Sequence, residues 1–198
     1  DLRSHGLVEF GKTINALALG FTTKLAIYAL ARGFAGTEIL VPIGALMAAF
    51  ATFYALIEND LRRGLAYSLI SQLGFMVVGI GVGSEMALNG TAAHAFASVL
   101  YKGLLFMAMG AVLYRTGTTR SSELGGLYAS MPWTALLCLV GSASIAGLPL
   151  FSGFISKSMI LAAAAENHYS LAYLVLLAAS AGVVLHSGIR ISYDTFFG

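Results

Sequence analysis

Six long apolar stretches dominate the sequence and limit the folds that it can adopt. They cover residues 13–32, 39–57, 65–83, 92–114, 133–163 and 169–189. A helix needs roughly 20 consecutive apolar residues to cross the hydrocarbon core of a bilayer. In lipid, backbone polar groups must be paired within the protein, and an α-helix pairs its own. The pattern therefore predicts an all-α, polytopic transmembrane helix bundle of about six spans. We expect residues 1–198 to form a single transmembrane domain.

The composition agrees with lipid as the main solvent. Charged residues make up 10% of the chain and hydrophobic residues 58%, whereas soluble domains carry about 25% charged residues. The net charge of +2 does not indicate nucleic acid as a partner. Cys138 is the only cysteine, so metal-ligand spacing is absent and we expect no metal. No catalytic residue set and no cofactor signature is present. The chain begins at Asp1 without a signal peptide, so we expect it to be part of a longer protein.

The fifth stretch is too long for one perpendicular helix and contains helix-breaking residues. Gly147, Pro149 and Gly153 lie together in its middle. Proline lacks a backbone N–H donor, and glycine relaxes the chain. Irregular backbone at membrane depth is tolerated only inside protein or beside a watery cavity. The sequence therefore predicts a helix broken within the membrane near Pro149.

Basic residues are distributed unevenly between the two ends of the predicted bundle. If six spans alternate in direction, one end receives Arg3, Lys12, Arg62, Arg63, Arg115, Arg120 and Arg190. Arg32 alone falls at the other end. Cytoplasmic loops of membrane proteins are enriched in Lys and Arg, so both chain ends are predicted to be cytoplasmic.

Three lysines lie inside predicted spans: Lys24 in the first, Lys102 in the fourth and Lys157 after the helix break. A central lysine costs about 2.5–3.5 kcal/mol on insertion-based scales. A purely structural bundle gains nothing from that cost. Because desolvation disfavours the charged form of an amine, a buried lysine can exchange its proton and act as a proton carrier. The alternative is that each lysine forms a static ion pair or lies at a helix end.

Other polar residues lie in or near the same spans. His94 lies two turns before Lys102, and Ser98 lies one turn from each. A ladder of these three side chains could hold water and pass protons, since histidine titrates near neutral pH. The alternative for His94 is a hydrogen bond to a neighbouring helix. Gln72 is expected to bond between helices, and His186, near the end of the last span, is expected to be interfacial.

Three ordered motifs resemble those of the antiporter-like membrane subunits. They are ENDLRRGLAYSLISQLGF over residues 58–75, HAF and YKGLLF within residues 94–106, and LPLFSGFISK over residues 148–157. This family includes the proton-pumping membrane-arm subunits of respiratory NADH:quinone oxidoreductase and the D-type subunits of multisubunit Na⁺/H⁺ antiporters. The two threonines before Lys24 and SELGGLY at residues 122–128 are most similar to the D-type antiporter branch.

The resemblance implies a path for protons along buried side chains near the middle of the membrane. Lys24 would be the connecting lysine, His94 and Lys102 the central pair, and Lys157 the broken-helix lysine at the exit side. It also implies other membrane subunits as partners, a lipid bilayer that is a bacterial inner membrane, and H⁺ with Na⁺ or K⁺ as the transported ions. No cofactor is implied.

The resemblance covers about residues 20–198, and residues 1–19 match the family poorly. The helix with the family's essential glutamate is absent, and Ser98 stands where many relatives have a second histidine. Three alternatives accompany the antiporter prediction. The chain could belong to a respiratory membrane-arm subunit, to a non-transporting scaffold with statically paired lysines, or to a membrane enzyme with a quinone or lipid cleft lined by His94.

Overall fold

The computed structural model describes residues 21–198, which form helices and no strand. A helix over residues 21–34 comes first. It is followed by α2 (Leu40–Ile57), α3 (Leu61–Val82), α4 (Glu85–Thr116), α5 (Pro132–Ala146), α6 (Ser152–Glu166), α7 (Ser170–Val183) and α8 (Ile191–Phe196). The 3₁₀-helix η1 (Ser121–Glu123) lies in the loop before α5, and the π-helix η2 (Val184–Arg190) joins α7 to α8. The prediction of an all-α protein is confirmed.

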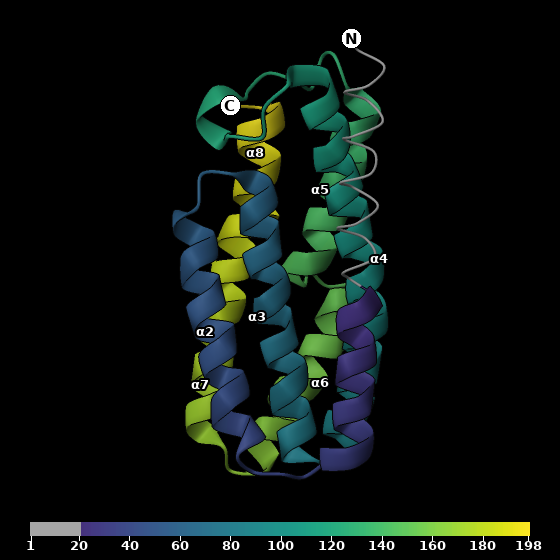
Figure 1. Ribbon diagram of the computed structural model, residues 1–198, viewed down its shortest axis with the longest axis vertical. Coiled ribbons are helices and arrows are strands. Elements are labelled where there is room, and N and C mark those ends of the chain that lie inside the picture. The colour runs from purple at the N-terminus through teal and green to yellow at the C-terminus, as the bar shows by residue number, and fades with distance from the viewer. Residues whose placement is uncertain (1–20) are drawn as a thin grey trace.

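The helices lie side by side along the long axis of the bundle (Figure 1). Over residues 21–198, four helices are long and apolar enough to cross a membrane: α2, α3, α4 and the continuous helix Ser170–Phe196. Outward-facing side chains such as Leu46 and Phe96 are exposed by 70% and 72%, as expected of a surface that faces lipid tails. The polytopic membrane fold is therefore confirmed. The apolar stretch predicts that the last span ends at residue 189, but η2 and α8 extend it to Phe196.

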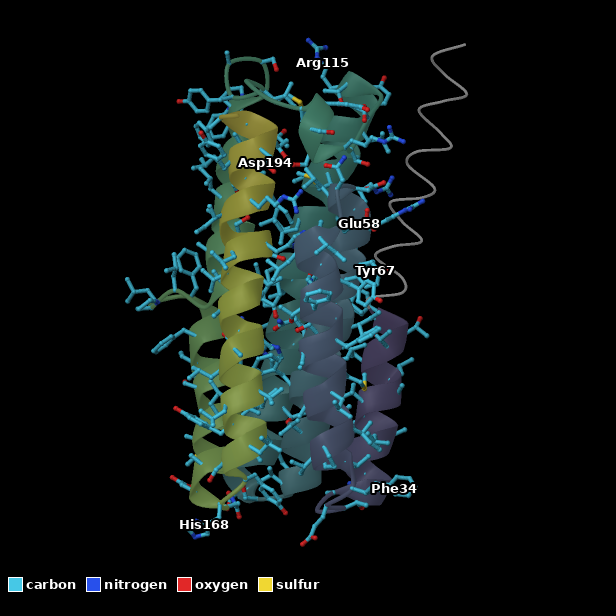
Figure 2. The ribbon with its side chains drawn as sticks, turned by 90° about the vertical axis from the view of Figure 1, so that its left-hand side faces the viewer. Phe34, Glu58, Tyr67, Arg115, His168 and Asp194 are labelled. Atoms are coloured by element: carbon cyan, nitrogen blue, oxygen red, sulfur yellow. The ribbon has the colours of Figure 1, made fainter. Side chains whose placement is uncertain are left out.

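All described arginines except Arg32 gather at one end of the bundle. Arg62 and Arg63 lie in the first turn of α3 and Arg115 in the last turn of α4. Arg120 pairs through its backbone with Asp60, which caps α3. Figure 2 shows Arg115 and Glu58 toward one end and Phe34 and His168 at the opposite end.

Arg190 also lies toward this end, because its Nη1 donates to the carbonyl of Leu56 at the end of α2 (2.8 Å). Arg32 lies near the opposite end, two residues before the helix over residues 21–34 ends. Arg3 and Lys12 lie outside the described residues. The clustering thus agrees with the alternation of spans that the sequence predicts, and which side of the membrane the arginines face stays a prediction.

The break predicted near Pro149 is confirmed, and it divides the fifth stretch into α5 and α6 (Figure 1). Gly147 ends α5 with a left-handed backbone (φ +80°), a conformation that glycine adopts without strain. A Cβ atom on Gly153 would overlap the carbonyl oxygen of Ser144. Glycine at this position therefore lets the start of α6 approach the end of α5 closely.

Helices α2 and α3 approach each other through two glycines. A Cβ atom on Gly44 would lie 2.8 Å from the Gly74 carbonyl oxygen, and one on Gly74 would lie 2.6 Å from the Gly44 carbonyl oxygen. Small residues at such crossings allow close backbone packing, which stabilises helix pairs in membranes.

We expect Gly74→Ala to destabilise the bundle by about 1–3 kcal/mol, because the added methyl group must push α2 and α3 apart. The midpoint of thermal unfolding of the purified protein in detergent would measure this loss. Gly33→Ala is the matched control, since a Cβ atom there meets nothing within 4 Å. Equal midpoints for the two variants would contradict the proposed role of the close approach.

Candidate functional site

Lys102 lies in the middle of α4 and points its amine at α3. The residue is 3% exposed. Its Nζ donates to the carbonyl oxygen of Leu65 (3.3 Å) and contacts the hydroxyl of Ser68. Ser68 in turn donates to the Leu65 carbonyl (2.8 Å). The amine is thus surrounded by neutral oxygen atoms of α3.

Lys157 is held by the break between α5 and α6. It is also 3% exposed, and its Nζ donates to the carbonyl oxygen of Ile145 (2.5 Å). This carbonyl is free to accept because α5 ends at Ala146, and the last four carbonyls of a helix lack intrahelical partners. The same amine lies 6.0 Å from the centre of the Phe75 ring, within the range of a cation–π contact.

His94 on α4 is fully buried and contacts two neighbouring helices. Its Nδ1 lies 2.9 Å from the hydroxyl of Ser156 on α6, and its Nε2 lies 2.8 Å from Oε1 of Gln72 on α3. An amide oxygen can only accept, so Nε2 is the donor in the contact with Gln72. The interhelical hydrogen bond expected of Gln72 is confirmed. The Tyr101 hydroxyl also donates to this Oε1 atom (3.5 Å).

Ser98 is buried between His94 and Lys102 along α4, but it donates its proton to the carbonyl of Ala95 (2.9 Å). The bridging role that the sequence suggests for it stays a prediction. The side chains that contact His94 and Lys102 come instead from α3 and α6. Reasoning along α4 could not find Ser68 and Ser156, because serines inside membrane helices are common and give no separate signal.

Lys24 lies on the helix over residues 21–34 and is half-buried. It lines a pocket of about 360 Å³ between this helix and α4, together with Tyr28, Thr91 and Ala95 among others. The lysine therefore faces the helix that carries His94 and Lys102.

The four candidate groups share one electrostatic environment. The charges of Lys24, Lys102 and Lys157 all act on His94. Within the described part of the chain, no ion pair joins Lys102 or Lys157 to a carboxylate. The amide nitrogen of Gln72 is buried beside His94 without a hydrogen-bond partner among the described residues. The site therefore combines exchangeable protons with neutral hydrogen-bonding groups.

His186 is covered by protein, since the residue is 1% exposed within η2. The helix continues ten residues past it, to Phe196. Its position near the membrane interface stays a prediction. His5 lies outside the described residues, and His168 lies in the turn between α6 and α7. Over residues 21–198, no group of three His, Cys, Asp or Glu side chains could hold a metal ion.

Comparison with known proteins places these features in a family. Residues 11–184 match the family described as "NADH:quinone oxidoreductase/Mrp antiporter, TM". The chain is 36% identical over 196 residues to the D subunit of a Na(+)/H(+) antiporter from Alkalihalophilus pseudofirmus, covering 93% of this chain and 39% of that protein. It is 39% identical over 144 residues to the L subunit of NADH-quinone oxidoreductase from Campylobacter jejuni, covering 72% of this chain and 24% of that protein.

The fold has a counterpart in the solved structure of the Mrp complex from Dietzia sp. DQ12-45-1b. The TM-score is 0.84 at 29% identity, and the match covers 89% of this chain and 34% of that chain. The chain therefore spans two fifths or less of the length of these relatives. Because the family match extends over most of its residues, the chain belongs to the NADH:quinone oxidoreductase/Mrp antiporter family of membrane proteins.

Proposed function

We propose that the chain is the proton-conducting part of a D-type subunit of a monovalent cation/proton antiporter. Protons pass along Lys24, His94, Lys102 and Lys157. The observation that carries this proposal is the burial of Lys102 and Lys157 against neutral oxygens alone among the described residues. The similarity to the D subunit of an antiporter over 93% of the chain supports the same function.

The burial of these amines argues against the scaffold alternative. A scaffold would hold each lysine in a static ion pair, because an unpaired charge in a low-dielectric interior is costly. Carbonyl and hydroxyl oxygens accept hydrogen bonds from either form of an amine. Such partners allow an amine to lose a proton and regain it, which a carboxylate partner would oppose by holding the charge in place.

Repulsion between the groups provides a reason for movement. The charges of Lys24 and Lys157 act on Lys102 as well as on His94. Like charges repel strongly where the effective dielectric is low. A proton that arrives on one lysine therefore disfavours a proton on the next, and charge is passed on instead of accumulating.

The proposal also covers partners, orientation and the transported cation. Relatives named as subunits of antiporter and respiratory complexes support other membrane subunits as partners. The end that carries Arg62, Arg63 and Arg115 faces the cytoplasm, since basic residues are retained on that side, and the membrane is a bacterial inner membrane. Na⁺ or K⁺ is exchanged for H⁺. A role in a respiratory membrane arm is the second candidate, favoured by the similarity to an NADH-quinone oxidoreductase subunit.

A transport assay tests the proposal. The complete protein, assembled with its partner subunits, is reconstituted into liposomes that contain a pH-sensitive dye, and Na⁺ or K⁺ is added outside. We expect a cation-dependent change of internal pH that protein-free liposomes lack. Proton movement that responds to NADH and quinone but not to a cation gradient would favour the respiratory candidate. An internal pH that responds to neither would contradict both.

A further inference from the structure

The π-helix η2 holds a buried histidine that the proposed lysine path does not use. His186 is 1% exposed, and its Nε2 has no hydrogen-bond partner among the described residues. A buried polar atom without a hydrogen bond lowers the stability of the fold, so a function for this nitrogen would explain its presence. The widened turn of a π-helix is itself uncommon and often occurs at functional sites.

The unpartnered nitrogen faces the helix that holds the Lys102 amine. A Cβ atom on Gly64 of α3 would overlap Nε2 of His186, so the imidazole reaches α3 only because residue 64 is glycine. The next residue, Leu65, offers its carbonyl to Nζ of Lys102. His186 and Lys102 therefore contact adjacent residues of α3, Gly64 and Leu65.

The other ring nitrogen of His186 contacts the next residue of its own helix. Its Nδ1 lies 3.1 Å from the hydroxyl of the fully buried Ser187. One turn later, Arg190 pairs with Asp194 (3.2 Å), and their side chains are 30% and 26% exposed. Asp194, labelled in Figure 2, also accepts from the hydroxyl of Ser121. Polar side chains therefore recur along this helix from the buried imidazole to a partly exposed carboxylate, at residues 186, 187, 190 and 194.

We propose that His186 connects Lys102 with the arginine-rich end of the bundle as a proton relay. This inference rests on the proposed function. One proton leaves the ammonium of Lys102 and binds Nε2 of His186, directly or through a water molecule. The proton on Nδ1 then passes to the Ser187 hydroxyl, which releases its own proton through water toward the arginine-rich end. No bond between heavy atoms changes, and the relay runs equally in reverse.

The ionisable side chains nearest to His186 are Lys102 on α4 and Arg190 and Asp194 on its own helix. The two groups on its own helix are paired with each other. Imidazole can bind a proton at one nitrogen and release one from the other.

His186→Gln in the complete, reconstituted complex tests the relay. Glutamine keeps a polar side chain but cannot carry a proton. We expect cation-driven proton transport to fall by about 10²-fold, the lower end of what a positioned proton-transfer group contributes. The rate should also become more sensitive to replacement of H₂O by D₂O, which a loss of packing alone would not produce. His168→Gln, in the exposed turn between α6 and α7, is the matched control and should transport normally.

The outcomes separate this inference from the proposed function. A normal rate in assembled His186→Gln, while Lys102→Ala is inactive, would overturn the relay alone. Normal rates in both variants would overturn the proposed function as well. If His186→Gln does not assemble, Ser187→Ala decides, because it removes one oxygen from a small buried side chain. A clear fall in its transport rate supports the relay, and a full rate refutes it.

Discussion

Lys102→Ala is expected to abolish proton transport while the protein still inserts and assembles. Alanine removes the exchangeable proton, and the Ser68 hydroxyl and the Leu65 carbonyl each lose the hydrogen bond from Nζ. The loss of transport should reach about 10²-fold or more, the scale of a positioned proton-transfer group. The measurement is the initial rate of internal pH change in liposomes that contain equal amounts of complex.

Two further variants show whether the proton or merely the positive charge at Lys102 matters. Arg115→Ala removes an exposed positive charge from the last turn of the same helix and should transport normally. Lys102→Arg keeps the positive charge, but arginine does not lose its proton in proteins. This variant should therefore be nearly as inactive as Lys102→Ala. Recovery of transport in the arginine variant would show that Lys102 has a static electrostatic role.

Lys157→Ala is expected to abolish transport to a similar extent, for a different structural reason. Its amine donates to the Ile145 carbonyl, which the helix break leaves without an intrahelical partner. This hydrogen bond holds the amine beside Phe75. Without the amine, no titratable side chain of α6 remains in the buried part of the described bundle. The same assay measures the effect, again at about 10²-fold or more.

The adjacent residue provides the control for Lys157. Ser158 is exposed and donates only to the Ile155 carbonyl of its own helix (2.9 Å). Ser158→Ala should therefore transport at the normal rate and insert normally. Substantial transport by assembled Lys157→Ala would show that protons bypass the broken helix, and the path would then have to be redrawn without α6.

Much of the fold could be predicted because lipid imposes a simple rule on sequence. Long apolar stretches must become helices, since the backbone finds no other partner in hydrocarbon. The helix break could be predicted for the same reason, because Gly147 and Pro149 interrupt an apolar stretch that is too long for one helix. The last helix continues past the apolar stretch to Phe196, and the ion pair of Arg190 with Asp194 makes these charges compatible with a continuing helix.

For the candidate site too, some features could be predicted from the sequence and others could not. Lys24, His94, Lys102 and Lys157 stand out in the sequence, because a basic side chain in an apolar stretch is costly and rare. Their contacts do not stand out. Ser68, Ser156 and the Ile145 carbonyl are brought to them from other helices by packing. The burial of His186 does not stand out either, because nothing near it in the chain reveals that Gly64 of α3 leaves room for its ring.

The sequence alone determined that this chain is a helical membrane protein with amines inside its spans. Both conclusions follow from transfer free energies, which depend on residue type and position along one helix. The tertiary structure alone decided what those amines contact and that His186 is buried beside the α3 backbone next to Leu65. These contacts depend on how helices rotate and approach one another, and that is settled by small residues on separate helices acting together.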